Sequence, residues 1–198
     1  MKRLIAIAGA LALCMLAAAP AQAGWKLVEH AKAVKVAKGK LSVTPHEDWN
    51  RNTDRPIKKG EVWTLDGAVL NELYFVSGLA AGETLFRDLD KKENPLPKLG
   101  SSILLSDIPD FYESSSRVAL KTSLFEIGTV EPTTFAGQQG IKFTFNYGVQ
   151  DSPVIRKGVA AATLVNGQLH MITFIAPTIY YFDRDAPKAE AIVASATL

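Results

Sequence analysis

The sequence predicts an α+β fold, with a large and mainly antiparallel sheet and two principal helices. Three observations support this prediction. Apolar and polar residues alternate with a period of two over residues 141–148, which is typical of a strand with one buried face. The dipeptide Asn166-Gly167 separates two apolar runs and favours a two-residue hairpin. Helix-capping residues and helical spacing indicate one helix over residues 107–120 and another at residues 186–196.

The N-terminal segment, residues 1–23, has the composition of a cleavable secretory signal peptide. Two basic residues follow Met1, residues 4–16 form an apolar core, and Ala21-Gln22-Ala23 is a small-x-small cleavage site. Residues 24–198 would then be the mature chain, forming a single domain. We expect it to be periplasmic or secreted in a bacterium.

Two alternatives to cleavage are less consistent with this segment. The apolar run 4–19 has 16 residues, whereas a membrane-spanning helix needs roughly 20. A lipoprotein signal would place its lipid on Cys14, but Leu13 stands where a small residue is expected, and the apolar run continues beyond the cysteine.

Cleavage changes the charge and the cysteine content of the chain. The full sequence has 22 basic and 20 acidic residues, and the loss of Lys2 and Arg3 leaves 20 of each. A neutral domain has no general electrostatic attraction to nucleic acid. Because Cys14 is the only cysteine, the mature chain has no disulfide and depends on its core. About 175 residues suffice for that, since a domain of this size buries roughly 70% of its unfolded surface.

The first half of the mature chain begins with a predicted hairpin. Residues 24–38 alternate small, apolar and basic side chains and indicate a strand with one wet face. A turn at Gly39-Lys40 joins it to a short strand over residues 41–45. Residues 46–60 are polar, with prolines nearby, and predict a loop.

A strand over residues 61–67 comes next, followed by a strand over residues 70–79 that is apolar on both faces and therefore covered on both sides. Residues 80–100 predict an exposed connection with a helical turn around residues 85–89. The helix over residues 107–120 has Ser106 or Asp107 as its cap and a proline in its first turn. Its apolar face comprises Ile108, Phe111, Tyr112, Ser115, Val118 and Ala119.

The second half is predicted to be mostly sheet. Residues 123–131 and 141–148 form strands joined by a turn at residues 135–140, and residues 156–165 and 169–176 form the hairpin around the Asn-Gly turn. An aromatic loop follows at residues 177–183. The final helix is expected to be capped by Asp183 or Asp185, with Pro187 in its first turn.

Several features of residues 120–198 point to a known superfamily. They are Glu131-Pro132, the segment GQQGIKF at 137–143, the hairpin GVAAATLVNGQLHMITF at 158–174, Ala176-Pro177 and the final helix. This arrangement resembles the PsbP-like superfamily of exported α/β/α sandwich domains. The resemblance implies that fold for the mature chain, with two principal helices. It also implies an accessory or binding module rather than an enzyme, and it supplies no functional residue.

Five aromatic residues in or beside predicted loops are the main candidates for a ligand or partner surface. They could line a cleft for a peptide, a glycan or a lipid-like ligand, or they could pack at the edge of the core. The residues are Trp49, Trp63, Tyr180, Tyr181 and Phe182.

Polar clusters give weaker indications of chemistry. His46-Glu47-Asp48-Trp49 offers a histidine and carboxylates, but it is not the zinc motif His-Glu-x-x-His, because the second histidine is missing. A solvated loop with Trp49 folded back onto the core is the simpler interpretation. His30 and His170 are distant in sequence, and we expect His170 to be a structural histidine in a strand.

Serines and paired carboxylates have similarly simple interpretations. Ser114-Ser115-Ser116 lies inside a predicted helix and has no nucleophile-elbow motif. Asp107 with Asp110, and Asp183 with Asp185, could act as acid–base pairs. Both pairs stand at predicted helix starts, where aspartate caps free N–H groups.

The sequence therefore favours a non-catalytic, exported binding or accessory module of the bacterial cell envelope. We expect no catalytic residue, cofactor or metal, and the partner would be an envelope protein or a small ligand. Contact with the membrane would be transient, through the signal peptide alone. The first alternative is a small periplasmic hydrolase with an unrecognised site. The second is an envelope assembly protein that works through a flat apolar surface.

Overall fold

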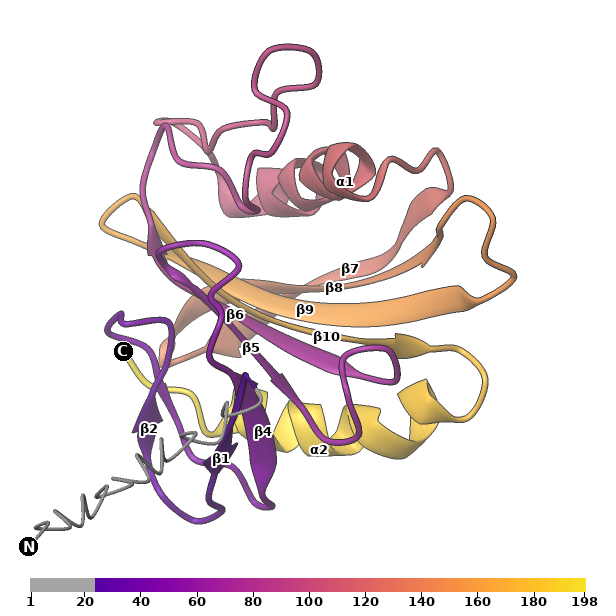
Figure 1. Ribbon diagram of the computed structural model, residues 1–198. Coiled ribbons are helices and arrows are strands. Elements are labelled where there is room, and N and C mark those ends of the chain that lie inside the picture. Colours follow the sequence, from indigo (N-terminus) through magenta and orange to yellow (C-terminus); the bar gives the residue numbers. More distant parts are fainter. Residues whose placement is uncertain (1–23) are drawn as a thin grey trace, which may run out of the picture.

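The computed structural model describes residues 24–198. The predicted signal peptide, including its cleavage site and Cys14, lies outside the described residues. Eight strands form one antiparallel sheet in the order β1-β4-β5-β6-β10-β9-β8-β7. Helix α1 covers one face and helix α2 the other (Figure 1). This architecture confirms the predicted α+β sandwich with two principal helices.

The elements have the following bounds. The sheet strands are β1 (Trp25–Val28), β4 (Trp49–Asn52), β5 (Gly60–Thr64), β6 (Glu72–Leu79), β7 (Phe125–Phe135), β8 (Gln138–Gly148), β9 (Ile155–Val165) and β10 (Gln168–Pro177). A separate small hairpin comprises β2 (Val34–Lys35) and β3 (Ser42–Val43). The helices are α1 (Ile108–Leu120), α2 (Tyr181–Ala194) and the 3-10 turn η1 (Leu105–Asp107). Neither helix of residues 24–198 has the length and hydropathy needed to cross a membrane.

The core on the α1 side is mainly aromatic. Side chains that alternate along β8 are buried against the helix, as the period-two pattern predicts. The ring of Tyr112 from α1 lies 4.9 Å from that of Phe145, and Phe125 of β7 stacks on Phe145 at 5.2 Å. Such ring pairs add about 0.5–1.5 kcal/mol each to the burial of apolar area.

The core on the α2 side is built around buried tryptophans. Trp63 of β5 packs on Phe75 of β6 with ring centroids 4.6 Å apart, and Phe182 and Ile192 of α2 belong to the same cluster. Strand β6 is buried on both faces from Leu73 to Leu79, which confirms the prediction of a strand covered on both sides.

Two tight hairpins shape the second half of the sheet. Asn166 and Gly167 have φ values of 51° and 70°, so they form the two-residue turn with positive φ that the sequence predicts. The turn predicted at residues 135–140 is tighter, since only Ala136 and Gly137 lie outside the strands, with φ values of 51° and 75°.

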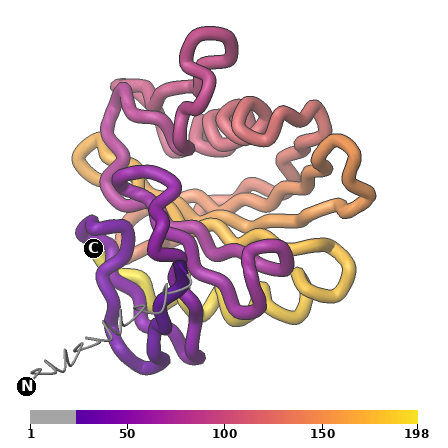
Figure 2. Tube along the Cα trace, in the orientation of Figure 1, coloured from indigo at the N-terminus to yellow at the C-terminus, as the bar shows by residue number. Residues whose placement is uncertain are grey.

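The N-terminal part differs from the prediction in two ways. The strand expected over residues 24–38 is divided into β1 and β2 by a turn in which Ala31 has a φ of 56°. The loop expected over residues 46–60 contains β4, which pairs with β1 and β5. This strand is short and polar after its first residue, so its neighbours in the sheet stabilise it rather than an alternating pattern. The C-terminal residues run beside the β2–β3 hairpin through the Ser42–Thr197 bridge (Figure 2).

The connection over residues 80–100 is less exposed than predicted. It projects on the α1 side of the sheet (Figure 2), but Leu85, Leu96 and Leu99 are buried. Backbone hydrogen bonds from Gly82 N–H to the Leu99 carbonyl (2.8 Å) and from Leu99 N–H to the Glu83 carbonyl (2.9 Å) close it into a loop. The helical turn expected at residues 85–89 does not form.

Helix α2 begins five residues earlier than predicted, at Tyr181. Pro187 was predicted to lie in the first turn of the helix, but it lies in the interior of α2. A proline there removes one helical hydrogen bond. Burial of Phe182 and Asp185 in the first two turns offsets that loss, because both side chains hold this part of the helix on the sheet.

Candidate functional site

The predicted aromatic surface is not formed as a unit. Trp49 and Trp63 are 0% exposed, so the prediction is wrong for them. Their indoles fill the space between the sheet and α2, and Trp63 Nε1 donates a hydrogen bond to Glu61 Oε1 at 2.8 Å. Phe182 is also buried and packs on Phe174 at 5.8 Å. The alternative, packing at the core, holds for these three residues.

Two of the five aromatic residues do reach the surface. Tyr180 is 65% exposed and Tyr181 is half-buried, and their rings meet edge to face at 5.4 Å. The Arg184 guanidinium lies 5.3 Å and 5.0 Å from the two ring centroids. Neither tyrosine lines any of the three cavities described below, so the pair lies outside them at the start of α2.

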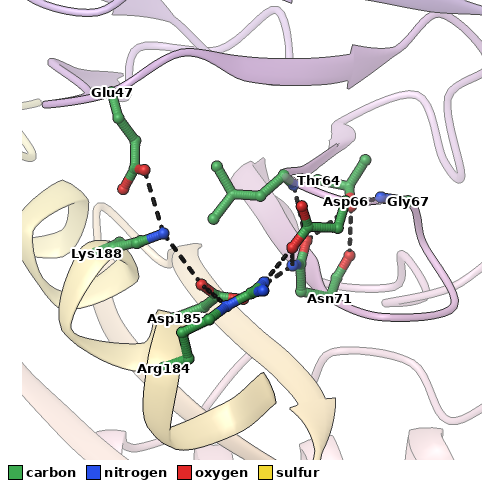
Figure 3. Close-up of polar contacts among 9 residues, drawn as sticks. Glu47, Thr64, Asp66, Gly67, Asn71, Arg184, Asp185 and Lys188 are labelled. Atoms are coloured by element: carbon green, nitrogen blue, oxygen red, sulfur yellow. Dashed lines mark hydrogen bonds and ion pairs between the residues drawn. The ribbon is translucent and has the colours of Figure 1, made fainter. Parts of the chain in front are cut away.

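Asp185 is the centre of a polar network that joins α2 to the sheet (Figure 3). Its side chain is 0% exposed; it accepts a hydrogen bond from Asn71 Nδ2 at 3.0 Å and pairs with Arg184 and with Lys188 at 3.2 Å. Although burial alone raises the pKa of Asp185, the hydrogen bonds from Arg184 and Lys188 outweigh it and hold the pKa below its usual range. Lys188 also pairs with Glu47 at 3.3 Å.

The paired aspartates have structural positions. The predicted capping role is wrong for Asp185, because the helix starts earlier and places this residue in its second turn. Asp183 lies in the first turn, where a carboxylate interacts favourably with the positive end of the helix dipole. Asp107 Oδ2 accepts a hydrogen bond from Leu104 N–H at 2.9 Å, so it caps η1 rather than α1, and Asp110 lies in the first turn of α1.

The cluster around His46 does not assemble a metal site. His46 is exposed, and Asp48 Oδ1 accepts a hydrogen bond from the backbone N–H of His30 at 2.8 Å and contacts its Nδ1 at 2.7 Å. The backbone hydrogen bond from His30 lowers the pKa of Asp48. Within residues 24–198 no three side chains of His, Cys, Asp or Glu are grouped so that they could hold a metal ion.

One serine–histidine pair does occur, away from the predicted serines. Ser77 Oγ lies 3.3 Å from His170 Nδ1, and each residue is 2% exposed. Burial lowers the pKa of His170, with a smaller effect from Lys40 and Lys59. Ser77 Oγ also accepts the Leu41 N–H, and Gly39 packs so closely that a Cβ there would lie 2.0 Å from it. The pair is therefore sealed from substrate, and it does not include Ser114–Ser116, which lie on α1.

A cleft of about 800 Å³ lies between the β4–β5 connection and the connection over residues 80–100. We call it the basic cleft, because six positively charged side chains and only two carboxylates line it. The carboxylates are Glu83 and Asp88. The cations are Arg55, Lys58, Lys59, Arg87, Lys91 and Lys98.

Contacts between the two connections hold the walls of the basic cleft in place. Arg87 Nη2 donates a hydrogen bond to the Arg55 carbonyl at 3.0 Å, and Lys59 Nζ pairs with Glu83 at 3.1 Å. Gly60 is required at the base of one wall, since a Cβ there would lie 2.7 Å from the side chain of Ile57. The lining is therefore pre-formed by the fold.

The charges in the basic cleft are only partly compensated. Arg55 Nη2 lies 3.4 Å from Glu61, a buried carboxylate that also contacts Arg51 and Trp63. The hydrogen bond from the backbone N–H of Ala80 lowers the pKa of Glu83, and the interaction with Lys59 lowers it to a smaller extent. In the described part of the chain the remaining four cations, Lys58, Arg87, Lys91 and Lys98, make no ion pair.

Two residues that line the basic cleft each have a buried polar atom with no hydrogen-bond partner among residues 24–198. The atoms are Nη1 of Arg55, a donor, and Oδ1 of Asp88, an acceptor. A buried polar atom without a hydrogen bond is uncommon in folded proteins. Because solvent does not reach these two atoms, the chemistry that the cleft offers to a ligand is mainly positive charge.

Two smaller grooves lie between α2 and the sheet. Their volumes are about 230 and 360 Å³, and Lys142 and Glu190, which pair at 3.0 Å, line both. The groove of about 360 Å³ is lined mainly by small apolar side chains, and both grooves carry fewer charged side chains than the basic cleft, so they offer less to fix a polar ligand.

The basic cleft was not among the sites predicted from the sequence. Its local signals are Arg55 with Lys58-Lys59 in one predicted loop, and Arg87 with Lys91 in another. Each charge cluster alone is an ordinary solvated loop. The convergence depends on β5 and β6 bringing the two loops together, which the pattern of a single segment does not reveal.

Comparisons with known proteins concern the fold. Neither a protein-family model nor a curated protein sequence matches the chain. Among solved structures, cyanobacterial PsbP from Synechocystis matches at 16% identity over 89% of this chain and 82% of that chain, with a TM-score of 0.40. LpqN of Mycobacterium tuberculosis, involved in cell envelope biogenesis, matches at 11% identity over 87% of this chain and 89% of that chain, with a TM-score of 0.36. Both similarities concern the arrangement of helices and strands.

Proposed function

We propose that this chain is a non-catalytic, exported binding module of the bacterial cell envelope, and that its basic cleft binds an anionic ligand. The observation that carries the proposal is the convergence of six cations on one cavity, in a chain whose basic and acidic residues nearly balance. Export is proposed from the N-terminal signal sequence.

The electrostatics of the basic cleft favour a ligand with more than one negative charge. Lys58, Arg87, Lys91 and Lys98 are four cations that form no ion pair with any of residues 24–198. Clefts lined by one sign of charge concentrate the opposite charge and accelerate its association. The pocket volume lies in the range of small-ligand sites, roughly 300–1,000 Å³. A concave site of this size suits a small polyanion better than a nucleic-acid strand.

The hydrolase alternative is supported by one observation, the contact between Ser77 and His170. A serine nucleophile must reach its substrate with a base beside it. Here both residues are buried and Gly39 covers the hydroxyl. The basic cleft is accessible, so binding at the cleft is the better-supported function.

The test measures anion binding by isothermal titration calorimetry on the protein purified after export. Tricarballylate and inorganic pyrophosphate serve as charged probes at low ionic strength. We expect binding of at least one probe, and an affinity at least tenfold weaker in Lys91→Glu. The matched control is Lys92→Glu, since Lys92 is the next residue along the chain and does not line the cleft. Raising the salt to 1 M should weaken binding, because the Debye length falls to about 3 Å.

Two outcomes would contradict the proposal. One is that neither probe binds. The other is that Lys91→Glu and Lys92→Glu weaken binding equally, which would show a diffuse surface effect instead of a site.

A further inference from the structure

Residues 36–41, which connect β2 to β3, are attached to the sheet at two points, and we call them the β2–β3 turn. The Ala37 N–H donates a hydrogen bond to the buried Glu61 carboxylate at 3.1 Å, and the Leu41 N–H donates one to Ser77 Oγ at 3.1 Å. Gly39 packs on the same serine, since a Cβ at Gly39 would lie 2.0 Å from Ser77 Oγ. The turn therefore closes over Ser77.

The hydrogen bonds at Ser77 determine which nitrogen of the His170 ring carries the proton. Ser77 Oγ accepts the Leu41 N–H, and its other hydrogen-bond partner within residues 24–198 is His170 Nδ1 at 3.3 Å. Buried hydroxyl groups are normally hydrogen-bonded, so the Ser77 hydroxyl donates its proton to Nδ1. Nδ1 is then an unprotonated acceptor, and the neutral ring carries its proton on Nε2.

Protonation of His170 would reverse this hydrogen bond. Both nitrogens of an imidazolium are donors, so Nδ1 would donate to Ser77 Oγ instead of accepting from it. The hydroxyl proton of Ser77 would then lose its acceptor in a place where both residues are only 2% exposed. A buried donor without a partner costs the desolvation of that group. The closed turn therefore favours the neutral imidazole.

The charged groups around His170 also oppose protonation. Burial lowers the pKa of His170, and the positive charges of Lys40, in the turn, and Lys59, ahead of β5, lower it further. Lys59 is paired with Glu83 at 3.1 Å, whereas no carboxylate of residues 24–198 forms an ion pair with His170 itself. The residue that faces His170 from β9 is the neutral Thr163.

We propose that the β2–β3 turn is an acid-released cover, which neutral His170 holds closed and which loosens when this histidine takes up a proton. Lifting the turn lets water reach the Ser77 hydroxyl and the imidazole, so the open form accepts the proton that the closed form resists. A ligand that binds the open form better, here the proton, shifts the population towards that form.

The direction and range of the pH effect follow from this difference in proton binding. The open form has the ordinary histidine pKa of about 6.5, and the closed form a lower one. The closed form is therefore favoured fully above about pH 6.5, and its advantage falls by up to about tenfold per pH unit below that value, until the closed form itself is protonated. Because Val36 and Leu41 are fully buried, the closed form dominates at neutral pH.

The experiment follows hydrogen exchange of the Leu41 amide by NMR between pH 7.5 and pH 5.5, on the protein purified after export. This amide reports the cover directly, because it is hydrogen-bonded to Ser77 Oγ. We expect its protection factor, corrected for the intrinsic exchange rate at each pH, to fall by about three- to tenfold. The Phe143 amide, in the middle of β8, should exchange more slowly at each pH, because it is released by unfolding of the sheet.

The His170→Gln variant removes the titrating group and retains a neutral side chain that can hydrogen-bond to Ser77. Its Leu41 protection should not change between pH 7.5 and pH 5.5. His46→Gln is the matched control, since His46 is exposed and makes no contact with Ser77, and it should retain the full fall. Thermal melts confirm that both variants fold, and the nitrogen chemical shifts of the His170 ring in the unmodified protein give its tautomer without any substitution.

Four results would overturn the proposal. The Leu41 protection could stay constant from pH 7.5 to pH 5.5, or it could fall equally in His170→Gln. Equal exchange of Leu41 and Phe143 would show that the turn opens only when the whole sheet unfolds. A neutral His170 ring with its proton on Nδ1 would remove the hydrogen-bond pattern on which the cover depends.

Discussion

The two buried carboxylates of residues 24–198, Asp185 and Glu61, have partners in their own element and also bind a residue from another part of the chain. Asp185 of α2 is bound by Asn71 from the sheet side, and Glu61 of β5 by Arg51 of β4 and by Trp63. An unpaired buried charge costs several kcal/mol, so such residues are tolerated only where partners converge. The sequence predicts Asp185 at a helix start, where an aspartate is most often a cap. The partner that decides its role lies 114 residues away.

Replacement of Asp185 tests whether its partners stabilise the folded protein. We expect Asp185→Asn to lower the free energy of unfolding by about 3 kcal/mol at pH 7, because Arg184 and Lys188 lose their shared carboxylate. The folded pKa of Asp185 is depressed, so its stabilisation is complete above the unfolded pKa of about 4 and is lost as the pH falls towards the folded value. The gap between the two proteins should therefore narrow in urea melts at pH 3.

The control for that prediction is Asp183→Asn, on the exposed side of the same helix. It should change the free energy of unfolding by less than about 1 kcal/mol, since it removes only a first-turn charge. A constant gap between Asp185→Asn and the unmodified protein from pH 7 to pH 3 would show that the carboxylate charge is not what stabilises this network.

At the scale of elements, hairpins were predictable because their signals are local. Asn166-Gly167 and the alternation along β8 fix a turn and a buried face within a few residues, and both are confirmed. Strand β4 was missed, since only Trp49 of its four residues is apolar and the strand exists through pairing with β1 and β5. The start of α2 was missed because Pro187 is tolerated inside the helix, a case in which packing overrides the local preference.

The Gly167→Val substitution tests the second hairpin. Gly167 has a φ of 70°, a left-handed conformation that costs a residue with a side chain about 1–2 kcal/mol, and a β-branched one more. We expect the melting temperature to fall by several degrees. Gly100→Val is the matched control, because Gly100 has no such φ and its nearest neighbour atom would be 3.9 Å from the new Cβ. An equal fall in melting temperature in both variants would mean that the geometry of the turn is not the cause.

At the scale of the whole molecule, the fold class was predictable and the candidate site was not. The alternation and turn signals define a sheet with helices, whereas the basic cleft forms only when the sheet brings two loops together. Lys58 and Lys98 line the same cleft although 40 positions separate them in the sequence. Neither residue differs in its local sequence from a solvated surface lysine, so tertiary structure alone reveals the site.

Both cores share one sheet, and this arrangement predicts that residues 24–198 unfold as a single unit. Trp49 and Trp63 are buried in the α2-side core, so tryptophan fluorescence reports that side, while far-UV circular dichroism reports every element. Small two-state domains show coincident transitions by different probes. We expect the two urea curves to have the same midpoint, in the unmodified protein and in Trp25→Phe, which removes the partly exposed indole of β1. A fluorescence midpoint that precedes the dichroism midpoint would mean that the α2-side core melts separately. The α1 side, which carries the basic cleft, would then be an independent unit.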